Sequence, residues 1–224
     1  IKKVLAYSTV SQLGYMFIGV GTGAFAAGVL HLTTHAFFKA CLFLGAGSVM
    51  HGMGDEPDIT RMGGLAKKMP HTALTFGIAT LAITGIVPFS GFFSKDSILH
   101  GALVSQNAAW PRIGSVAYAL GSVAAFCTAF YMVRLFALTF LGTARTKAAV
   151  EAHESSPVMT GPLWVLAILS IVALVLGLPA LAAFGSWGEL FTHFLAPVFA
   201  QADRALGAGL HGEVALWPFG IAWL

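Results

Sequence analysis

Residues 4–38 read VLAYSTVSQLGYMFIGVGTGAFAAGVLHLTTHAFF and contain no Asp, Glu, Lys or Arg. A membrane-spanning helix needs about 20 apolar residues, so this run is too long for one helix and long enough for two. Glycines at positions 19, 21 and 23 lie in its middle and favour a turn there. The run predicts a helical hairpin over about 4–20 and 25–49. A nucleotide-binding loop would need a strand before these glycines, and that context is missing.

The 224 residues as a whole have the composition of an integral, multi-pass membrane protein. Hydrophobic residues make up 57% and charged residues only 9%, whereas about a quarter of the residues of a soluble domain are charged. Further uncharged runs cover 69–94, 113–133 and 155–188. This pattern excludes a disordered tail, a coiled coil and a secreted disulfide scaffold. The net charge of +3 comes from basic residues in loops between apolar runs, which indicates membrane topology and not nucleic-acid binding.

The apolar region from about 71 to 106 is interrupted by GIVPFSG at 85–91 and then by Lys95 and Asp96. Gly85 and Pro88 at membrane depth, followed directly by charge, predict a discontinuous helix whose unwound backbone faces protein or water. The alternative is a plain two-helix hairpin with Lys95 and Asp96 in its turn. The fold class we predict is therefore all-α, a polytopic transmembrane bundle with one discontinuous helix.

The rest of the chain adds loops and further spans. Residues 50–70 predict a loop with a short interfacial helix. Spans follow over about 113–141 and 161–184, then an interfacial segment over 186–209 and a sixth span from about 213. We divide the chain into a transmembrane repeat (1–142), a cytoplasmic loop (143–160) and an incomplete carboxyl-terminal part (161–224), and expect the whole to be a fragment. Seven lysines and arginines fall on the amino-terminal side and two on the other, which predicts that the amino-terminal side is cytoplasmic or matrix.

His31, His35 and Lys39 follow one another at intervals of four residues, so they share one face of the second helix over about 12 Å. A lysine at the bilayer centre costs about 2.5 to 3.5 kcal/mol, so Lys39 needs a wet cavity or a partner. Histidine titrates near neutral pH and suits a proton relay. The alternative is structural: the histidines bond to other helices and Lys39 pairs with a carboxylate.

Lys95 is the second ionisable candidate, with Asp96 capping or orienting a neighbouring group; the alternative is a lysine that snorkels to the interface. Ser94 is expected to cap the second half of the broken helix. Ser8, Ser11 and Gln12 on the first helix either line a hydrated path or bond to other helices, and both interpretations stay open.

No metal or redox centre is predicted in this chain. Its two cysteines, Cys41 and Cys127, are too few for an iron–sulfur cluster that needs four thiolates. His31 and His35 lie on the same helix face, so they cannot hold a haem iron from opposite sides.

Four segments resemble the antiporter-like subunits of respiratory complex I, most closely the branch known as subunit L or chain 5. They are IKKVLAYSTVSQLGY (1–15), HLTTHAFFKA (31–40), GFFSKD (91–96) and HESSPVMT (153–160). The resemblance covers about residues 1–185. It implies most of the second of two inverted five-helix repeats, with the family's central lysine at Lys39, its histidines at His31 and His35, and its broken-helix lysine at Lys95.

The resemblance further implies a subunit of a proton-translocating NADH-quinone oxidoreductase, in the bacterial cytoplasmic (inner) membrane or a mitochondrial-type inner membrane. NADH, FMN, the iron–sulfur clusters and quinone would bind to partner subunits, so this chain would hold no cofactor and do no redox chemistry. Its partners would be other membrane-arm subunits, lipid and protons, with no nucleic acid. The lysine–glutamate pair of the first repeat is absent, so this chain alone should not pump.

The sequence departs from the family at two positions near Lys95. Val87-Pro88 stands where two consecutive prolines are common, and Ser97 replaces a common acidic residue. Two other functions remain as alternatives. One is the large subunit of a multisubunit sodium/proton antiporter or of a membrane-bound hydrogenase. The other is a non-transporting membrane scaffold, in which Lys39 and His31 could be replaced by Leu.

Overall fold

The computed structural model describes residues 1–105, 112–173, 175 and 187–205. Every regular element in these residues is a helix, in agreement with the all-α prediction. The sixth span expected near residue 213 lies outside the described residues, as does most of 174–184 at the end of the fifth predicted span.

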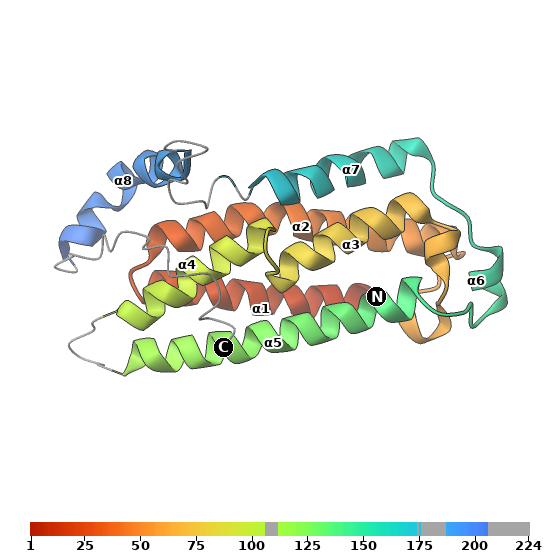
Figure 1. Cartoon of the computed structure of the whole chain (residues 1–224), viewed down its shortest axis with the longest axis horizontal. Helices are drawn as coiled ribbons and strands as arrows, with labels where there is room; N and C mark the ends of the chain where they lie inside the picture. The colour runs from red at the N-terminus through yellow and green to blue at the C-terminus, as the bar shows by residue number, and fades with distance from the viewer. Residues whose placement is uncertain (106–111, 174, 176–186, 206–224) are drawn as a thin grey trace.

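Among the described residues, three helices are long and apolar enough to cross a membrane. They are α1 (Lys2–Gly21), α2 (Phe25–Gly52) and α5 (Ile113–Phe140). The first two form the hairpin that the sequence predicts, with the turn at residues 22–24. Figure 1 shows α1, α2 and α5 running along the length of the bundle, with α7 (Pro157–Val172) above α2 and α8 (Trp187–Ala205) at one end.

The discontinuous helix consists of α3 (Pro70–Thr84) and α4 (Ser90–Val104). In Figure 1, α4 goes on along the bundle from where α3 ends and does not fold back beside it. Gly85 ends α3 with a φ of 79°, a left-handed conformation that glycine adopts without a steric penalty. Pro88 lies in the exposed turn between the halves. The broken helix is therefore confirmed, and the two-helix hairpin is wrong.

The two halves meet very closely at Gly91. A Cβ atom at this position would lie 1.9 Å from the Ala82 carbonyl oxygen near the end of α3. Only a glycine allows α4 to begin against the last turn of α3, so the geometry of the break depends on this residue.

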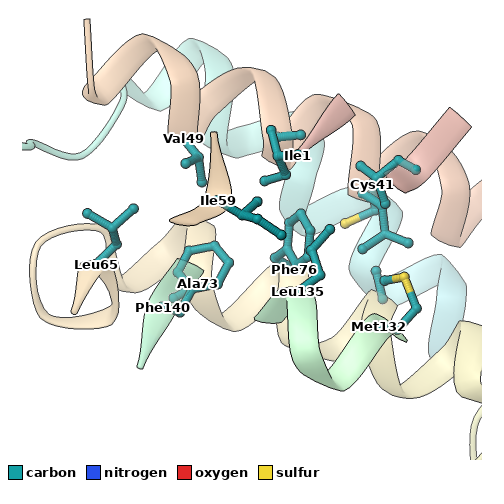
Figure 2. Close-up of a cluster of buried hydrophobic side chains, with 14 of the residues drawn as sticks. Ile1, Cys41, Val49, Ile59, Leu65, Ala73, Phe76, Met132, Leu135 and Phe140 are labelled. Carbon is teal, nitrogen blue, oxygen red and sulfur yellow. The ribbon is translucent and has the colours of Figure 1, made fainter. Parts of the chain in front are cut away.

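Buried apolar side chains fill the space between α2, α3, α5 and the loops at one end of the bundle. Figure 2 shows Phe76 beside Leu135, with Ile59 from the 53–69 segment next to them and Phe140 beside Ala73. Phe76 and Phe140 have ring centroids 5.3 Å apart. Because lipid is as apolar as these side chains, close packing is what holds the helices together here.

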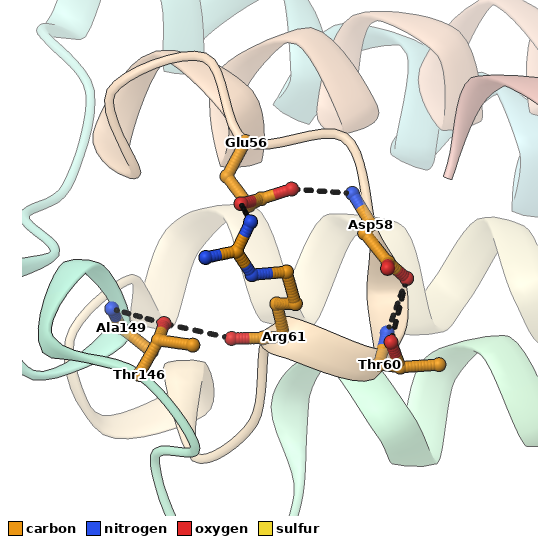
Figure 3. A network of polar contacts seen from close by, with 6 residues as sticks. All are labelled: Glu56, Asp58, Thr60, Arg61, Thr146 and Ala149. Atoms are coloured by element: carbon orange, nitrogen blue, oxygen red, sulfur yellow. Dashed lines mark hydrogen bonds and ion pairs between the residues drawn. The ribbon is translucent and has the colours of Figure 1, made fainter.

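The polar segments 53–69 and 141–156 lie against each other at that same end. Thr146 donates to the Arg61 carbonyl at 2.8 Å and accepts from the Ala149 N–H at 3.3 Å, as Figure 3 shows. The expected interfacial helix in the first segment is two short 3-10 turns, η1 (Ile59–Arg61) and η2 (Leu65–Lys67). The second segment contains a short helix, α6 (Lys147–Glu151), within the predicted loop.

Arg145 joins the two segments to the end of α5. Its Nη1 lies 2.9 Å from the Leu138 carbonyl oxygen, 3.1 Å from that of Met62 and 3.3 Å from that of Ile59. The backbone nitrogen of Ile1 lies 2.6 Å from the Pro57 carbonyl oxygen, so the start of α1 is at this end as well. The basic residues counted on the amino-terminal side are thus brought together, while Arg112 precedes α5 at the opposite end.

Candidate functional site

The polar face of α2 is buried inside the bundle. His31 is fully buried, His35 is 7% exposed and Lys39 is 5% exposed. Their spacing places them on one side of the helix, and the His31 and His35 ring centroids are 6.1 Å apart. The predicted ladder of three titratable residues is therefore present, with Lys39 at the middle of the 28-residue helix.

His31 is held at both ring nitrogens. Its Nδ1 lies 2.9 Å from the Ser94 hydroxyl on α4, and its Nε2 lies 3.2 Å from the Gln12 amide oxygen on α1. Thr34 donates to the Ser94 hydroxyl at 3.1 Å. With Thr34 donating, Ser94 can donate to Nδ1, and the Nε2–H then donates to Gln12. Three helices thus meet at one imidazole.

Polar atoms without partners lie next to this group. Lys39 Nζ, His35 Nε2 and Gln12 Nε2 are buried and have no hydrogen-bond partner among the described residues. The Lys39 ammonium lies 5.8 Å from the Phe43 ring centroid and forms no ion pair within that part of the chain. A buried polar atom without a partner is costly, so these three atoms mark a place where bound water would be stabilised.

Lys95 extends from α4 to the end of α3. Its ammonium donates to the Ile83 carbonyl at 2.5 Å and lies 5.3 Å from the Tyr15 ring centroid. The last carbonyls of a helix lack partners within the helix and carry partial negative charge, so a cation is favoured there. Lys95 is 3% exposed, and the interpretation as a snorkelling interfacial lysine is wrong.

The other predicted residues have different environments. Asp96 follows Lys95 but is half-buried and forms no ion pair with it. Gly85 lies against Lys95, since a Cβ atom at position 85 would be 3.6 Å from Lys95 Cδ. Ser8 accepts a hydrogen bond from the Tyr131 hydroxyl at 2.7 Å. Ser11 is half-buried on α1 and is not part of the group around His31.

One sequence prediction is corrected and one residue was missed. Ser94 does not cap the second half-helix, because α4 begins four residues earlier at Ser90; its hydroxyl bonds to His31 instead. Tyr15 was not singled out, yet its ring lies between the two polar groups, 5.9 Å from the His31 ring and 5.3 Å from the Lys95 ammonium. Its hydroxyl donates to the Gly121 carbonyl on α5. Tyr15 ends the stretch SQLGY at 11–15, and nothing in that pattern indicates these contacts.

Within the described residues, no three His, Cys, Asp or Glu side chains come together as ligands. The site consists of a row of buried titratable side chains with hydroxyl and amide groups beside them.

Comparison with known proteins places this arrangement in context. The sequence model of the family described as NADH:quinone oxidoreductase/Mrp antiporter, TM matches residues 1–121. The chain is 44% identical to the NAD(P)H-quinone oxidoreductase chain 5 of Picosynechococcus sp., over 95% of this chain and 33% of that protein. It is 42% identical to the NADH-quinone oxidoreductase subunit L of Mycobacterium tuberculosis, over 93% of this chain and 31% of that protein. The chain thus spans about a third of the length of these relatives.

A solved structure shares the fold. The Mrp complex from Dietzia sp. DQ12-45-1b contains a chain that superposes with a TM-score of 0.65 at 24% sequence identity, over 92% of this chain and 44% of that one. At this identity the likeness concerns the fold alone.

Proposed function

Because the chain belongs to the NADH:quinone oxidoreductase/Mrp antiporter transmembrane family, we propose that it carries protons in the membrane arm of an NADH-quinone oxidoreductase. In this proposal Lys39 gains and loses a proton during turnover, while His31 and His35 pass protons beside it and Lys95 receives them at the broken helix. The relatives named as NADH-quinone oxidoreductase subunits support the choice of complex.

The observation that carries the proposal is that the Lys39 ammonium is buried without a hydrogen-bond partner among the described residues. It is buried at the middle of a membrane-spanning helix, and no carboxylate or carbonyl oxygen of the described residues bonds to it. A structural lysine at this depth would be paired, because an unpaired charge is expensive away from water. An unpaired lysine beside two histidines is suited to repeated loss and gain of a proton.

The contacts of His31 support its role as a relay. A neutral imidazole accepts at one ring nitrogen and donates at the other, so a proton taken up at Nδ1 can be given up from Nε2. Ser94 and Gln12 occupy these two positions. Water at the unpartnered His35 and Gln12 atoms would continue the chain towards Lys39.

Lys95 is the next acceptor in the proposed route. Its ammonium is held by the Ile83 carbonyl, which is freed because α3 ends one residue later. Such an arrangement stabilises the proton on Lys95 until a change in the site displaces it. We place the amino-terminal side of the chain in the cytoplasm or matrix, so that Lys95 would lie towards the outer face.

Electron transfer belongs to other subunits in this proposal. NADH, FMN, iron–sulfur clusters and quinone would be bound by partner subunits, and other membrane-arm subunits would contact this one. The proposed location is a bacterial cytoplasmic membrane or a mitochondrial-type inner membrane.

The test is Lys39→Met in the full-length subunit, with NADH oxidation and proton uptake followed together in inverted membrane vesicles. If proton uptake falls further than NADH oxidation while the complex assembles normally, so that fewer protons are pumped per NADH, Lys39 belongs to a redox-coupled pump. If NADH oxidation is unchanged and sodium/proton exchange is lost, the chain belongs to an antiporter, and the matching family, whose description includes the Mrp antiporter, supports this alternative. If neither changes, the ladder is structural and the proposal fails.

A further inference from the structure

The helix α3 begins without a local cap. Met69 at its N-cap position provides no side-chain hydrogen bond, and Pro70 has no N–H to donate. The next two N–H groups, of His71 and Thr72, point to the Glu154 carboxylate from the 141–156 segment. His71 N donates to Glu154 Oε2 at 2.8 Å and Thr72 N to the same oxygen at 3.2 Å.

The carboxylate is fixed by two more bonds. The Thr72 hydroxyl donates to Glu154 Oε1 at 2.6 Å and the Ser155 N–H donates to it at 3.1 Å. Ser155 and Thr72 both bond to the Ser48 hydroxyl of α2, at 2.7 Å and 2.8 Å. A residue 82 positions from Thr72 in sequence thus completes the first turn of α3 and ties it to α2.

At the C-terminal end of α3, the bound group is a cation and not a carboxylate. Lys95 donates to the Ile83 carbonyl there, and Gly85 leaves room for its side chain. A helix has partial positive charge at its N-terminus and partial negative charge at its C-terminus, so an anion and a cation are favoured at these two ends. Glu154 and Lys95 therefore bind the two ends of one half-helix, about 22 Å apart along its axis.

We infer that Glu154 is a positioning residue for Lys95: it holds α3 at the depth at which the Ile83 carbonyl meets the Lys95 ammonium. A shift of α3 along its axis would lengthen bonds at both ends, so the two contacts are coupled through the helix. The inference rests on the proposed function of Lys95. The 141–156 segment lies at the polar end of the bundle. Through Glu154 and α3, a contact made with this segment would change the position of the Ile83 carbonyl that binds Lys95.

A direct proton-carrying role for Glu154 fits the contacts less well. Both oxygens of its carboxylate are already occupied, because they accept four hydrogen bonds from the first turn of α3 and from Ser155. The hydrogen-bonded hydroxyl groups of Thr72 and Ser155 connect Glu154 to Ser48. Ser48 is nine positions from Lys39 on α2, so this connection does not reach the lysine.

The experiment compares Glu154→Gln with Glu151→Gln in the full-length subunit of the assembled complex. Glu151 lies in the same segment, but its side chain is 66% exposed and, within the part of the chain that the structure describes, it pairs with exposed Lys147 alone. Two quantities are measured in inverted vesicles and in the purified complex: protons pumped per NADH, and hydrogen exchange along α3.

We expect Glu154→Gln to lower the protons pumped per NADH. It should also speed exchange about two- to fivefold at both ends of α3, the range that loss of a charge at a helix end produces. The informative amides are Thr72 at one end and Gly85 and Ile86 at the other, which bond to Ala82 and Leu81. Glu151→Gln should change neither quantity.

Faster exchange confined to the first turn of α3, with pumping unchanged, would overturn the inference. If Glu154→Gln prevents assembly, Thr72→Val removes one bond to the carboxylate together with the bond to Ser48 and keeps the other three bonds to Glu154. It should give the same two-ended pattern at smaller size. Lys95→Gln distinguishes the proposed proton-carrying role of Lys95 from the positioning role of Glu154. If it leaves pumping unchanged, the proposed role of Lys95 fails, while the exchange at Gly85 and Ile86 still decides whether Glu154 positions this end of α3.

Discussion

His31 Nδ1 and the Ser94 hydroxyl are hydrogen-bonded at 2.9 Å although 63 positions separate them in sequence. This bond joins the histidine ladder of α2 to the second half of the broken helix. Ser94 directly precedes Lys95, so the same turn of α4 carries a partner for the ladder and the lysine that binds the end of α3. The ladder and the break are therefore parts of one site.

Ser94→Ala should weaken both the site and its function. Loss of the hydroxyl leaves His31 Nδ1 buried without a partner, which costs about 1–3 kcal/mol. We expect a lower unfolding temperature of the purified complex and fewer protons pumped per NADH. Ser97→Ala is the control, because the Ser97 hydroxyl bonds to the Phe93 carbonyl within its own helix and to no other group among the described residues. Equal effects of the two variants would contradict the role of Ser94.

Gly91→Ala should disrupt the broken helix. The added Cβ would lie 1.9 Å from the Ala82 carbonyl oxygen, so one half-helix must move. Overpacking of this kind costs about 1–3 kcal/mol and occasionally more. The amount of assembled complex in membranes measures the effect. Gly47→Ala on α2 is the control, because nothing lies within 4 Å of the added atom; normal assembly of Gly91→Ala would show that the halves are not in close contact.

Arg145→Gln should loosen the polar end of the bundle. One guanidinium nitrogen approaches three carbonyl oxygens there, and a hydrogen bond to a charged group contributes about 1.5–3 kcal/mol. We expect faster proteolysis within 53–69 and 141–146. Lys147→Gln removes a positive charge two positions away whose side chain is 88% exposed, and should have little effect. Similar cleavage rates in both variants would mean that Arg145 does not hold the segments together.

The 53–69 segment should lose a stabilising contribution in acid. The Thr60 N–H and then the Thr60 hydroxyl bond to the Asp58 carboxylate and lower its pKa below the usual 3.8. A lowered pKa means that the contribution is present above pH 3.8 and is lost as pH falls through the lower folded-state value. Hydrogen exchange of the Thr60 amide should therefore be faster in Asp58→Asn than in the unaltered protein at pH 7. The ratio of the two exchange rates should approach one in acid.

Asp55→Asn provides the control for that ratio, which should stay near one at every pH. Taking the ratio at each pH removes the intrinsic pH dependence of exchange. A ratio for Asp58→Asn that does not change between pH 7 and pH 3 would contradict the role assigned to the Asp58 carboxylate.

The sequence was sufficient for features set by local spacing. Residues four apart share a helix face, so the ladder of His31, His35 and Lys39 could be predicted without a structure. Gly85 and Pro88 within an apolar run indicated the break for a similar local reason, since both end helices.

The contacts that complete the site could not be predicted in this way. Ser94 was expected to cap its own helix, because Ser at the start of a helix is a common cap, but the break places the start of α4 four residues earlier. Glu154 caps a helix from 83 positions away, as counted to His71, and such pairing depends on how the helices pack. Tyr15 differs from other aromatic residues of α1 only in facing the interior, which its sequence position does not reveal.

The most direct test of the central claim is the number of protons pumped per NADH in Lys39→Met, compared with Lys68→Met at equal amounts of assembled complex. Lys68 is an exposed lysine of the 53–69 segment, so the control removes the same charge outside the site. We predict that Lys39→Met pumps clearly fewer protons per NADH and that Lys68→Met matches the unaltered complex. An unchanged ratio in Lys39→Met would show that Lys39 carries no protons and would contradict this account.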